Sequence, residues 1–300
     1  MQSERLLNCE KERFSGVYFS ALAVLMLVAN LVFSVFLASS GRSEELIKTP
    51  WVTFLSFSVS GIVIICITAF FSYTKKIPIV EICGWKRVEP KYYLIAVLTF
   101  LAVFFGLGNL NSAFISFLEK SVGYKSNAVE LPPLSVPNYL MVTLTVCILP
   151  AVTEEVAMRG VIQSGVKSGN LIINALIGGF IFSIYHMNPS QTPYQFAFGF
   201  VLSIIAIKSR STLATTIAHF LNNFAIINIE YFCKSAFNFQ GVWLAVAIVL
   251  GLSLLVGIVY YLLKKEKTED LEKGSLKAFF ISAIPGLIVC LLMWIANLFA

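Results

Sequence analysis

The sequence contains few charged residues. Lys, Arg, Asp and Glu make up 13% of its 300 residues, and apolar residues make up 58%. An ordinary soluble domain carries roughly 25% charged residues. A soluble protein with so few charges could not cover its surface with them, so the excess apolar surface must face lipid. The composition therefore excludes an ordinary soluble enzyme and predicts an integral membrane protein.

Several chemical signatures are also missing. The six cysteines are scattered and form no C-x-x-C pair, so neither a disulfide framework nor a thiolate zinc site is expected. There is no H-E-x-x-H zinc pair, and the chain has only two histidines. The net charge of +6 comes without a basic stripe interleaved with aromatics, so we expect no nucleic-acid partner and a lipid bilayer instead. No internal repeat is visible.

Long apolar stretches fill most of the chain. A helix that crosses a bilayer needs about 20 mainly apolar residues. Nine stretches are candidates, near 16–38, 51–73, 91–117, 139–167, 171–187, 193–207, 212–229, 241–263 and 277–298. The sixth is short, which leaves an eight-span arrangement open. The predicted fold is all-α, a polytopic transmembrane helix bundle of eight or nine spans that forms a single domain over 1–300, with no large soluble part.

Basic residues are concentrated in two connections. The stretches 74–91 and 264–277 each carry five Lys or Arg residues. In a nine-span arrangement both lie on the same side as the N-terminus. Cytoplasmic loops carry the excess of Lys and Arg. We therefore expect a cytoplasmic N-terminus, in the plasma membrane of a prokaryote.

Glu154, Glu155 and Arg159 lie within the fourth apolar stretch. A charge inside a membrane span costs several kcal/mol, so ionisable residues there are usually functional. On a helix, Glu155 and Arg159 are one turn apart and can form an ion pair, which suits a structural brace. Glu154 points about 100° away and suits a general base. Pro150 is expected to kink the helix just before the pair. The alternative is that these are interfacial charges at a helix end.

Both histidines also fall in apolar stretches. His186 follows a long uncharged run, and Phe182 lies one turn before it on the same face. His219 and Asn223 are likewise one turn apart, and both side chains can donate hydrogen bonds to a carbonyl oxygen as it becomes negative. Each histidine alone also fits a hydrogen-bonded core residue or polar contact between helices.

The depths of these residues in their helices agree. Glu154 and His186 each lie roughly 20 Å from the turn that joins their two helices, at about 1.5 Å per residue. His219 and Asn223 lie about 10–17 Å into their own helix, within reach if the helix tilts. An antiparallel arrangement would bring the four together in a core about 139–229.

The pattern E-E-x-x-x-R, then F-x-x-x-H, then H-x-x-x-N in successive helices resembles the CAAX protease and bacteriocin-processing (CPBP) family, which includes the type II CAAX prenyl endopeptidases. The matching residues are Glu154, Glu155, Arg159, Phe182, His186, His219 and Asn223. The resemblance covers about a quarter of the chain.

This resemblance implies an intramembrane endopeptidase. Glu154 would activate water, His186 would position it, and His219 and Asn223 would stabilise the oxyanion, with structural support from Glu155, Arg159 and Phe182. The substrate would be a membrane-associated or prenylated CAAX-type peptide. Family members are described both as metalloproteases and as metal-independent glutamate enzymes. Glu154, His186 and His219 could ligate zinc or another divalent metal, because two histidines and one carboxylate form a known catalytic set.

Two other functions remain open at this stage. A non-catalytic bacteriocin self-immunity or scaffold protein could use the same fold without chemistry at Glu154. A proton-coupled transporter could use glutamate and histidine as a proton relay. Transporters are commonly built from inverted repeats, and the missing repeat weakens that alternative.

Overall fold

The structure is a computed structural model that describes residues 2–39, 49–125, 131–233, 240–265 and 271–299. These parts of the chain are helical and contain no strand, only one isolated bridge between Ser168 and Lys273. The helices are α1 Gln2–Ser39, α3 Pro50–Lys75, α4 Ile79–Cys83, α5 Pro90–Ala102, η1 Val103–Leu107, α6 Gly108–Val122, α7 Val136–Val142, η2 Thr143–Ile148, α8 Leu149–Glu155, η3 Val156–Ile162, η4 Gln163–Gly165, α9 Leu171–Tyr185, η5 Pro189–Gln191, α10 Thr192–Ser209, α11 Leu213–Asn228, η6 Ile229–Cys233, α12 Gly241–Lys265 and α13 Leu276–Leu298.

The predicted all-α fold is confirmed, and each of the nine predicted stretches is helical over most of its length. Within the described ranges, six helical stretches are long and apolar enough to cross a bilayer: Glu10–Ser39, Pro50–Lys75, Pro90–Val122, Val136–Gly165, Gly241–Lys264 and Leu276–Leu298. Helix α9 is apolar but shorter. The arrangement of eight or nine spans therefore stays a prediction, because the helices between residues 171 and 233 do not meet this measure.

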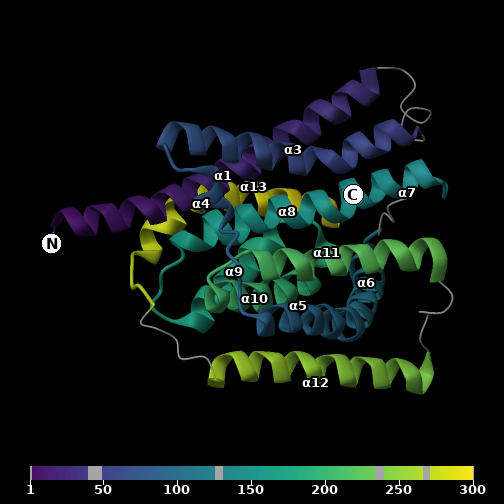
Figure 1. Ribbon diagram of the computed structural model, residues 1–300. Helices are drawn as coiled ribbons and strands as arrows, with labels where there is room; N and C mark the ends of the chain where they lie inside the picture. Colours follow the sequence, from purple (N-terminus) through teal and green to yellow (C-terminus); the bar gives the residue numbers. More distant parts are fainter. Residues whose placement is uncertain (1, 40–48, 126–130, 234–239, 266–270, 300) are drawn as a thin grey trace.

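The helices that carry the predicted site residues lie in the middle of the bundle. Helix α1 packs against α13 and α3 on one side, and α12 packs against α5 and η1 on the other. Helices α8, α9, α10 and α11 lie between these two groups (Figure 1). Long apolar helices thus flank the segments that carry the predicted site residues on both sides.

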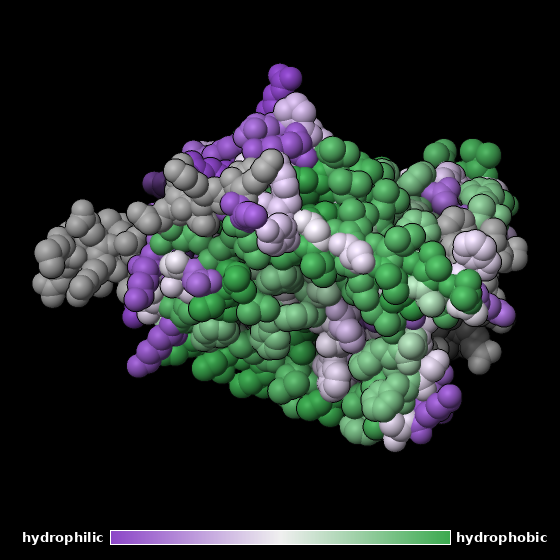
Figure 2. Space-filling view, turned by 90° about the horizontal axis from the view of Figure 1, so that it is seen from below, coloured by the Kyte–Doolittle hydropathy of each residue, from purple (hydrophilic) through white to green (hydrophobic). Residues whose placement is uncertain are grey.

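The outer surface is apolar. Figure 2 shows a broad hydrophobic face with many of the hydrophilic side chains toward its edges. Large side chains of α12 are exposed on the outside, among them Val249, Leu250 and Val256. An apolar surface of this extent on the single chain indicates contact with lipid.

Glycines allow α9 and α10 to approach closely. A Cβ on Gly179 of α9 would lie 2.7 Å from the carbonyl oxygen of Phe196 and 2.9 Å from the amide nitrogen of Phe200. A Cβ on Gly199 of α10 would lie 2.9 Å from the Phe182 ring. Small residues at membrane helix contacts permit this approach of backbones. The close contact also places the Phe182 ring directly against α10.

Several turns meet at the end of the bundle where the basic residues gather. The amide of Thr212 donates to the carbonyl of Gly84 at 3.1 Å, and the amide of Gly274 donates to the carbonyl of Lys167 at 2.9 Å. Buried Glu12 accepts from the amide of Ser275 at 2.7 Å. These contacts place the described parts of both basic stretches and the start of α1 at one end (Figure 1), as the orientation argument requires.

The helix that carries Glu154 and Glu155 is not uniformly α-helical. The six residues of η2 before it and the seven residues of η3 after it are π-helical. Pro150 lies in the first turn of α8, where it has no amide hydrogen to donate. The kink expected at Pro150 stays a prediction, and the helix around it has π-helical segments on both sides of α8. Short π-helical insertions are frequent at functional sites.

Replacing Gly179 by Ala should destabilise the bundle, because the new methyl group meets backbone atoms of α10 that cannot rotate away. Overpacking of this kind costs about 1–3 kcal/mol. Thermal unfolding in detergent would measure the loss. Gly257→Ala is the control, since a Cβ there meets nothing within 4 Å. Equal melting temperatures for the two variants would contradict the close contact.

Candidate functional site

The predicted ion pair between Glu155 and Arg159 is present. Nη1 of Arg159 lies 2.8 Å from Oε1 of Glu155, and both residues are buried. Nη2 of Arg159 donates to the carbonyl of Gly199 at 3.2 Å. One turn later, Nε2 of Gln163 donates to the carbonyl of Ser203 at 3.0 Å. The helix with the glutamates is therefore bound to α10 by two side chains in the same register.

Phe182 forms the shared wall of the site. Its ring centroid lies 4.4 Å from Cζ of Arg159, a cation–π contact. It also lies 4.8 Å from the His186 ring centroid and 5.8 Å from that of His219, with both ring pairs edge-to-face. Phe182 is fully buried. One side chain thus sets the positions of both histidines and the guanidinium.

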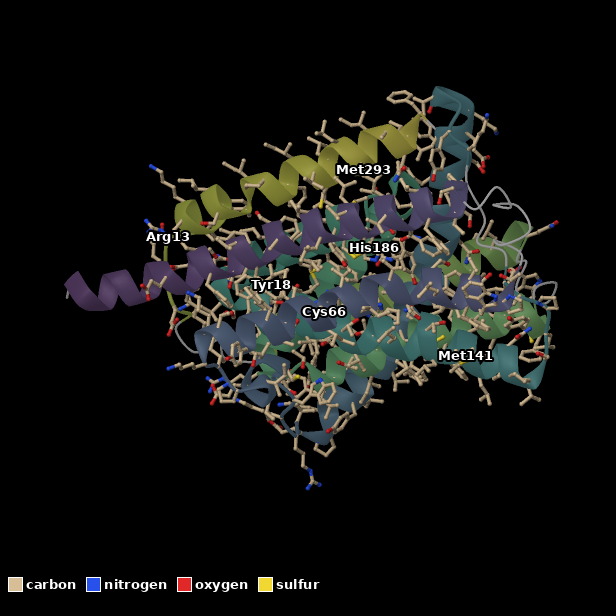
Figure 3. All side chains as sticks on the ribbon, turned by 90° about the horizontal axis from the view of Figure 1, so that it is seen from above. Arg13, Tyr18, Cys66, Met141, His186 and Met293 are labelled. Carbon is tan, nitrogen blue, oxygen red and sulfur yellow. The ribbon has the colours of Figure 1, made fainter. Side chains whose placement is uncertain are left out.

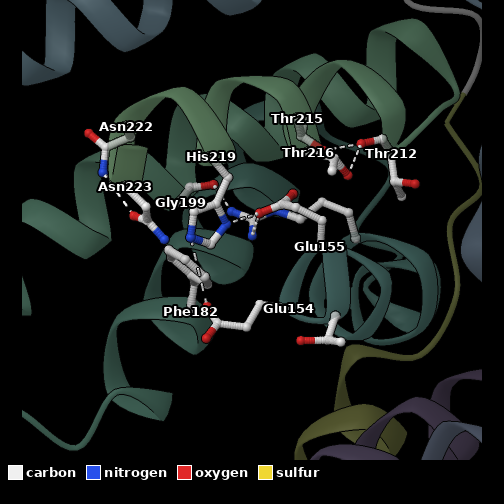
Figure 4. Close-up of polar contacts among 12 residues, drawn as sticks. Glu154, Glu155, Phe182, Gly199, Thr212, Thr215, Thr216, His219, Asn222 and Asn223 are labelled. Carbon is white, nitrogen blue, oxygen red and sulfur yellow. Dashed lines mark hydrogen bonds and ion pairs between the residues drawn. The ribbon is translucent and has the colours of Figure 1, made fainter. Parts of the chain in front are cut away.

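The structure brings Glu154 and the two histidines together. Oε2 of Glu154 lies 3.9 Å from Nε2 of His186 and 4.0 Å from Nε2 of His219. The two glutamates face different nitrogens of His219, since Oε1 of Glu155 lies 3.1 Å from Nδ1 (Figure 4). His186 itself lies inside the bundle, between the end marked by Arg13 and the end marked by Met141 (Figure 3).

The hydrogen bonds assign the protons of both rings. Nδ1 of His186 lies 2.7 Å from the carbonyl oxygen of Phe182, which can only accept. Nδ1 of His219 lies 3.1 Å from the carboxylate of Glu155, which also accepts. Both Nδ1 atoms must therefore carry hydrogen. In a neutral ring, each Nε2 then presents a lone pair toward Glu154.

Three hydrogen-bond acceptors consequently lie close together: Oε2 of Glu154, Nε2 of His186 and Nε2 of His219. Oε2 of Glu154 is buried and has no hydrogen-bond partner among the described protein atoms. A carboxylate oxygen that faces two imidazole lone pairs needs a donor between them, because such groups are costly to bury unsatisfied. The separations of 3.9 and 4.0 Å are too long for direct hydrogen bonds. The geometry calls for a small donor at this position.

The same three atoms do not form a metal-binding group as they are placed. A tetrahedral zinc ion with bonds of about 2.0–2.1 Å holds its ligand atoms about 3.4 Å apart. The separations from Glu154 are wider, and the described residues contain no group of three or more His, Cys, Asp or Glu arranged to hold a metal ion. The chemistry of the set would suit zinc, as the sequence suggests, but its spacing does not.

Asn223 lies on the same face of α11 as His219, one turn later. Its Nδ2 donates to the backbone carbonyl of Val146 at 3.1 Å, and its Oδ1 accepts from Asn222 at 3.4 Å. An amide nitrogen carries two hydrogens. The Val146 carbonyl takes one of them, so the other can donate to a bound molecule beside the His219 ring (Figure 4).

Two residues near the site are not among the sequence predictions. Asn222 stands beside the predicted Asn223 and is buried, and Tyr194 of α10 donates to its Oδ1. The sequence offers a signal for Asn222, since a second amide in an apolar helix is unusual. It offers none for Tyr194, which resembles any tyrosine near the end of a membrane helix.

Residues 136–225 match the family model of the Type II CAAX prenyl endopeptidase Rce1-like family. The resemblance inferred from the motifs is thereby confirmed over a segment that runs from α7 into α11 and includes every predicted site residue. The matched family is one of peptidases. No curated protein and no solved structure matches the chain.

Replacing Arg159 by Met should lower stability by about 3–5 kcal/mol, because it leaves the buried carboxylate of Glu155 without its partner. The double variant Glu155→Gln, Arg159→Met should recover part of the loss, since residue 155 then carries no charge that needs a partner. Thermal or denaturant unfolding in detergent would measure both. Glu89→Gln, at the exposed pair with Lys91, is the control and should change stability by less than about 1 kcal/mol. A double variant less stable than Arg159→Met would contradict the argument.

Proposed function

We propose that this chain is an intramembrane endopeptidase in which Glu154 activates a water molecule for attack on a peptide bond. The observation that carries the proposal is the cluster of three acceptors, with Oε2 of Glu154 between the Nε2 atoms of His186 and His219. A water about 2.8 Å from Glu154 and from one Nε2 would see those two atoms about 90° apart, close to the angle between its own hydrogens.

The charges of the site favour transfer of a proton from water to Glu154. Glu154 and Glu155 carry −2 and Arg159 carries +1, so the buried set is −1 before any histidine is protonated. A proton taken from water makes this set neutral, which a low-dielectric interior favours. Glu154 takes a proton from water as its oxygen attacks the scissile carbonyl. The same proton then passes to the departing amine, directly or through His186.

We assign stabilisation of the developing oxyanion to Asn223 and His219. Asn223 can donate its second amide hydrogen at once. His219 donates from Nδ1 to Glu155, so its Nε2 can donate only when the ring is protonated, and the adjacent carboxylate stabilises that cation. Preorganised donors of this kind stabilise charge that develops in the transition state.

The family match and the position of the site support a proposal for the substrate class. We assign a membrane-associated or prenylated CAAX-type peptide, because the matched family is named for prenyl endopeptidases and the site lies within an apolar bundle. We assign catalysis to the core 139–229 of a single membrane domain. We also assign the basic end, and with it the N-terminus, to the cytoplasmic face of a prokaryotic plasma membrane.

Glu154→Gln should lower cleavage of a quenched fluorescent prenyl-peptide by about 10²–10⁴-fold, because the amide cannot take the proton from water. Rates would be measured on protein reconstituted in liposomes, with unfolding curves to show that the variant folds. Glu119→Gln, an exposed acid on α6, is the control. Wild-type activity in Glu154→Gln would end the assignment. The same peptide without its prenyl group would test the substrate class separately.

Removal of metal should leave the rate unchanged. In the proposed mechanism, Glu154 and the histidines act without a bound ion, so dialysis against EDTA and 1,10-phenanthroline should alter cleavage by less than about twofold. Metal content of the purified protein would be measured in parallel. Loss of activity that returns on addition of zinc would show that the site closes around a metal.

A further inference from the structure

A chain of hydrogen bonds leads from α10 to Asn223. The hydroxyl of Tyr194 is bonded to Oδ1 of Asn222. Nδ2 of Asn222 donates to Oδ1 of Asn223 at 3.4 Å, and Nδ2 of Asn223 donates to the backbone carbonyl of Val146 at 3.1 Å. These bonds connect α10, α11 and η2. None of the links involves Glu154 or a histidine.

The carbonyl of Val146 determines which group donates and which accepts along this series of hydrogen bonds. The Val146 carbonyl can only accept, so the amide nitrogen of Asn223 must face it. The oxygen of Asn223 then faces Asn222, which must offer its own nitrogen. The oxygen of Asn222 is consequently left for Tyr194, whose hydroxyl has to donate. If the amide of Asn222 or Asn223 turned over, two acceptors or two donors would face each other in a part-buried site, which is unfavourable.

Tyr194 is itself held in position. Its ring packs on Phe198, with centroids 6.3 Å apart, and Phe198 packs on the His219 ring at 5.9 Å. The next turn of α10 presents the carbonyl of Gly199 to Arg159. The helix that carries the phenol is therefore bonded to the same guanidinium that holds Glu155.

We propose that Tyr194 and Asn222 are positioning residues that hold the amide of Asn223 with its nitrogen toward the reacting carbonyl. This inference rests on the proposed function, since it deepens the oxyanion role of Asn223. Val146 holds the nitrogen of Asn223, and Asn222 holds its oxygen. Without the second bond, the Asn223 amide turns over more readily and presents its oxygen, which repels an oxyanion. The role goes beyond contact between helices, because a simple contact would not require one direction of the hydrogen bonds.

Tyr194→Phe removes only the hydroxyl and keeps the ring on Phe198. In the prenyl-peptide assay, kcat should fall about tenfold with KM unchanged within about twofold, since the lost ordering matters mainly in the transition state. Tyr139→Phe is the matched control. Tyr139 donates to Oδ1 of Asn228 at 3.0 Å, a tyrosine–asparagine bond to the same helix α11 that does not reach Asn223. The Tyr139→Phe variant should leave kcat unchanged.

A double-variant comparison separates positioning from general packing. Asn223→Ala alone should lower kcat by about 10²–10³-fold, the usual effect of losing an oxyanion donor. Tyr194→Phe should add almost nothing to Asn223→Ala, because its effect passes through Asn223. If Tyr194→Phe lowered kcat tenfold both in the wild type and in Asn223→Ala, the inference would be overturned. An unchanged kcat in Tyr194→Phe would also overturn it. If Glu154→Gln is inactive in the same assay, that second result leaves the proposed function standing.

A measurement without turnover keeps the inference testable if no peptide is cleaved. In protein labelled with ¹⁵N-asparagine, the side-chain amide signals of Asn223, identified by their loss in Asn223→Ala, should shift in Tyr194→Phe and stay in place in Tyr139→Phe. Unmoved Asn223 signals in Tyr194→Phe would refute the hydrogen-bond chain whatever the protein does.

Discussion

The ion pair of Glu155 with Arg159 is the constraint on which the rest of the site depends. Two opposite charges in a low-dielectric interior must stay together, because separating them leaves each at a cost of several kcal/mol. The pair also forms hydrogen bonds with its surroundings. Arg159 donates to the backbone of α10, and Glu155 accepts from Nδ1 of His219. The charge pair thus joins three helices around one point.

Adjacent glutamates acquire different chemistry from this arrangement. Glu155 has a cation and an imidazole N–H within bonding distance, so it is held as an acceptor. Glu154, one residue earlier, has an oxygen that meets only lone pairs. Glu155 holds the helices together, and Glu154 has a buried oxygen without a hydrogen-bond donor among the described residues. One peptide unit of helical rotation, about 100°, is enough to produce the difference.

Much of this could be predicted from the sequence, and the missing parts have physical reasons. Helical spacing alone identifies the ion pair and the contact of Phe182 with His186, because both depend on one turn of one helix. The proximity of Glu154 to His186 follows from helix lengths and antiparallel order. The proton positions on the rings and the contribution of Tyr194 depend on contacts between helices, which no periodicity records. The number of spans depends on which helices face lipid, and apolar length alone does not determine it.

The π-helical segments on either side of α8 bear on which changes of chain length this helix can accept. A π-helical turn closes its hydrogen bond one residue later than an α-helical turn, so it holds one extra residue within a continuous helix. If that residue were removed, the turn could close to α geometry and the residues on either side would keep their directions. A residue removed from α8 itself has no such reserve, and everything beyond it would turn by about 100°. The directions of Glu154 and Glu155 therefore depend on the length of α8 staying unchanged.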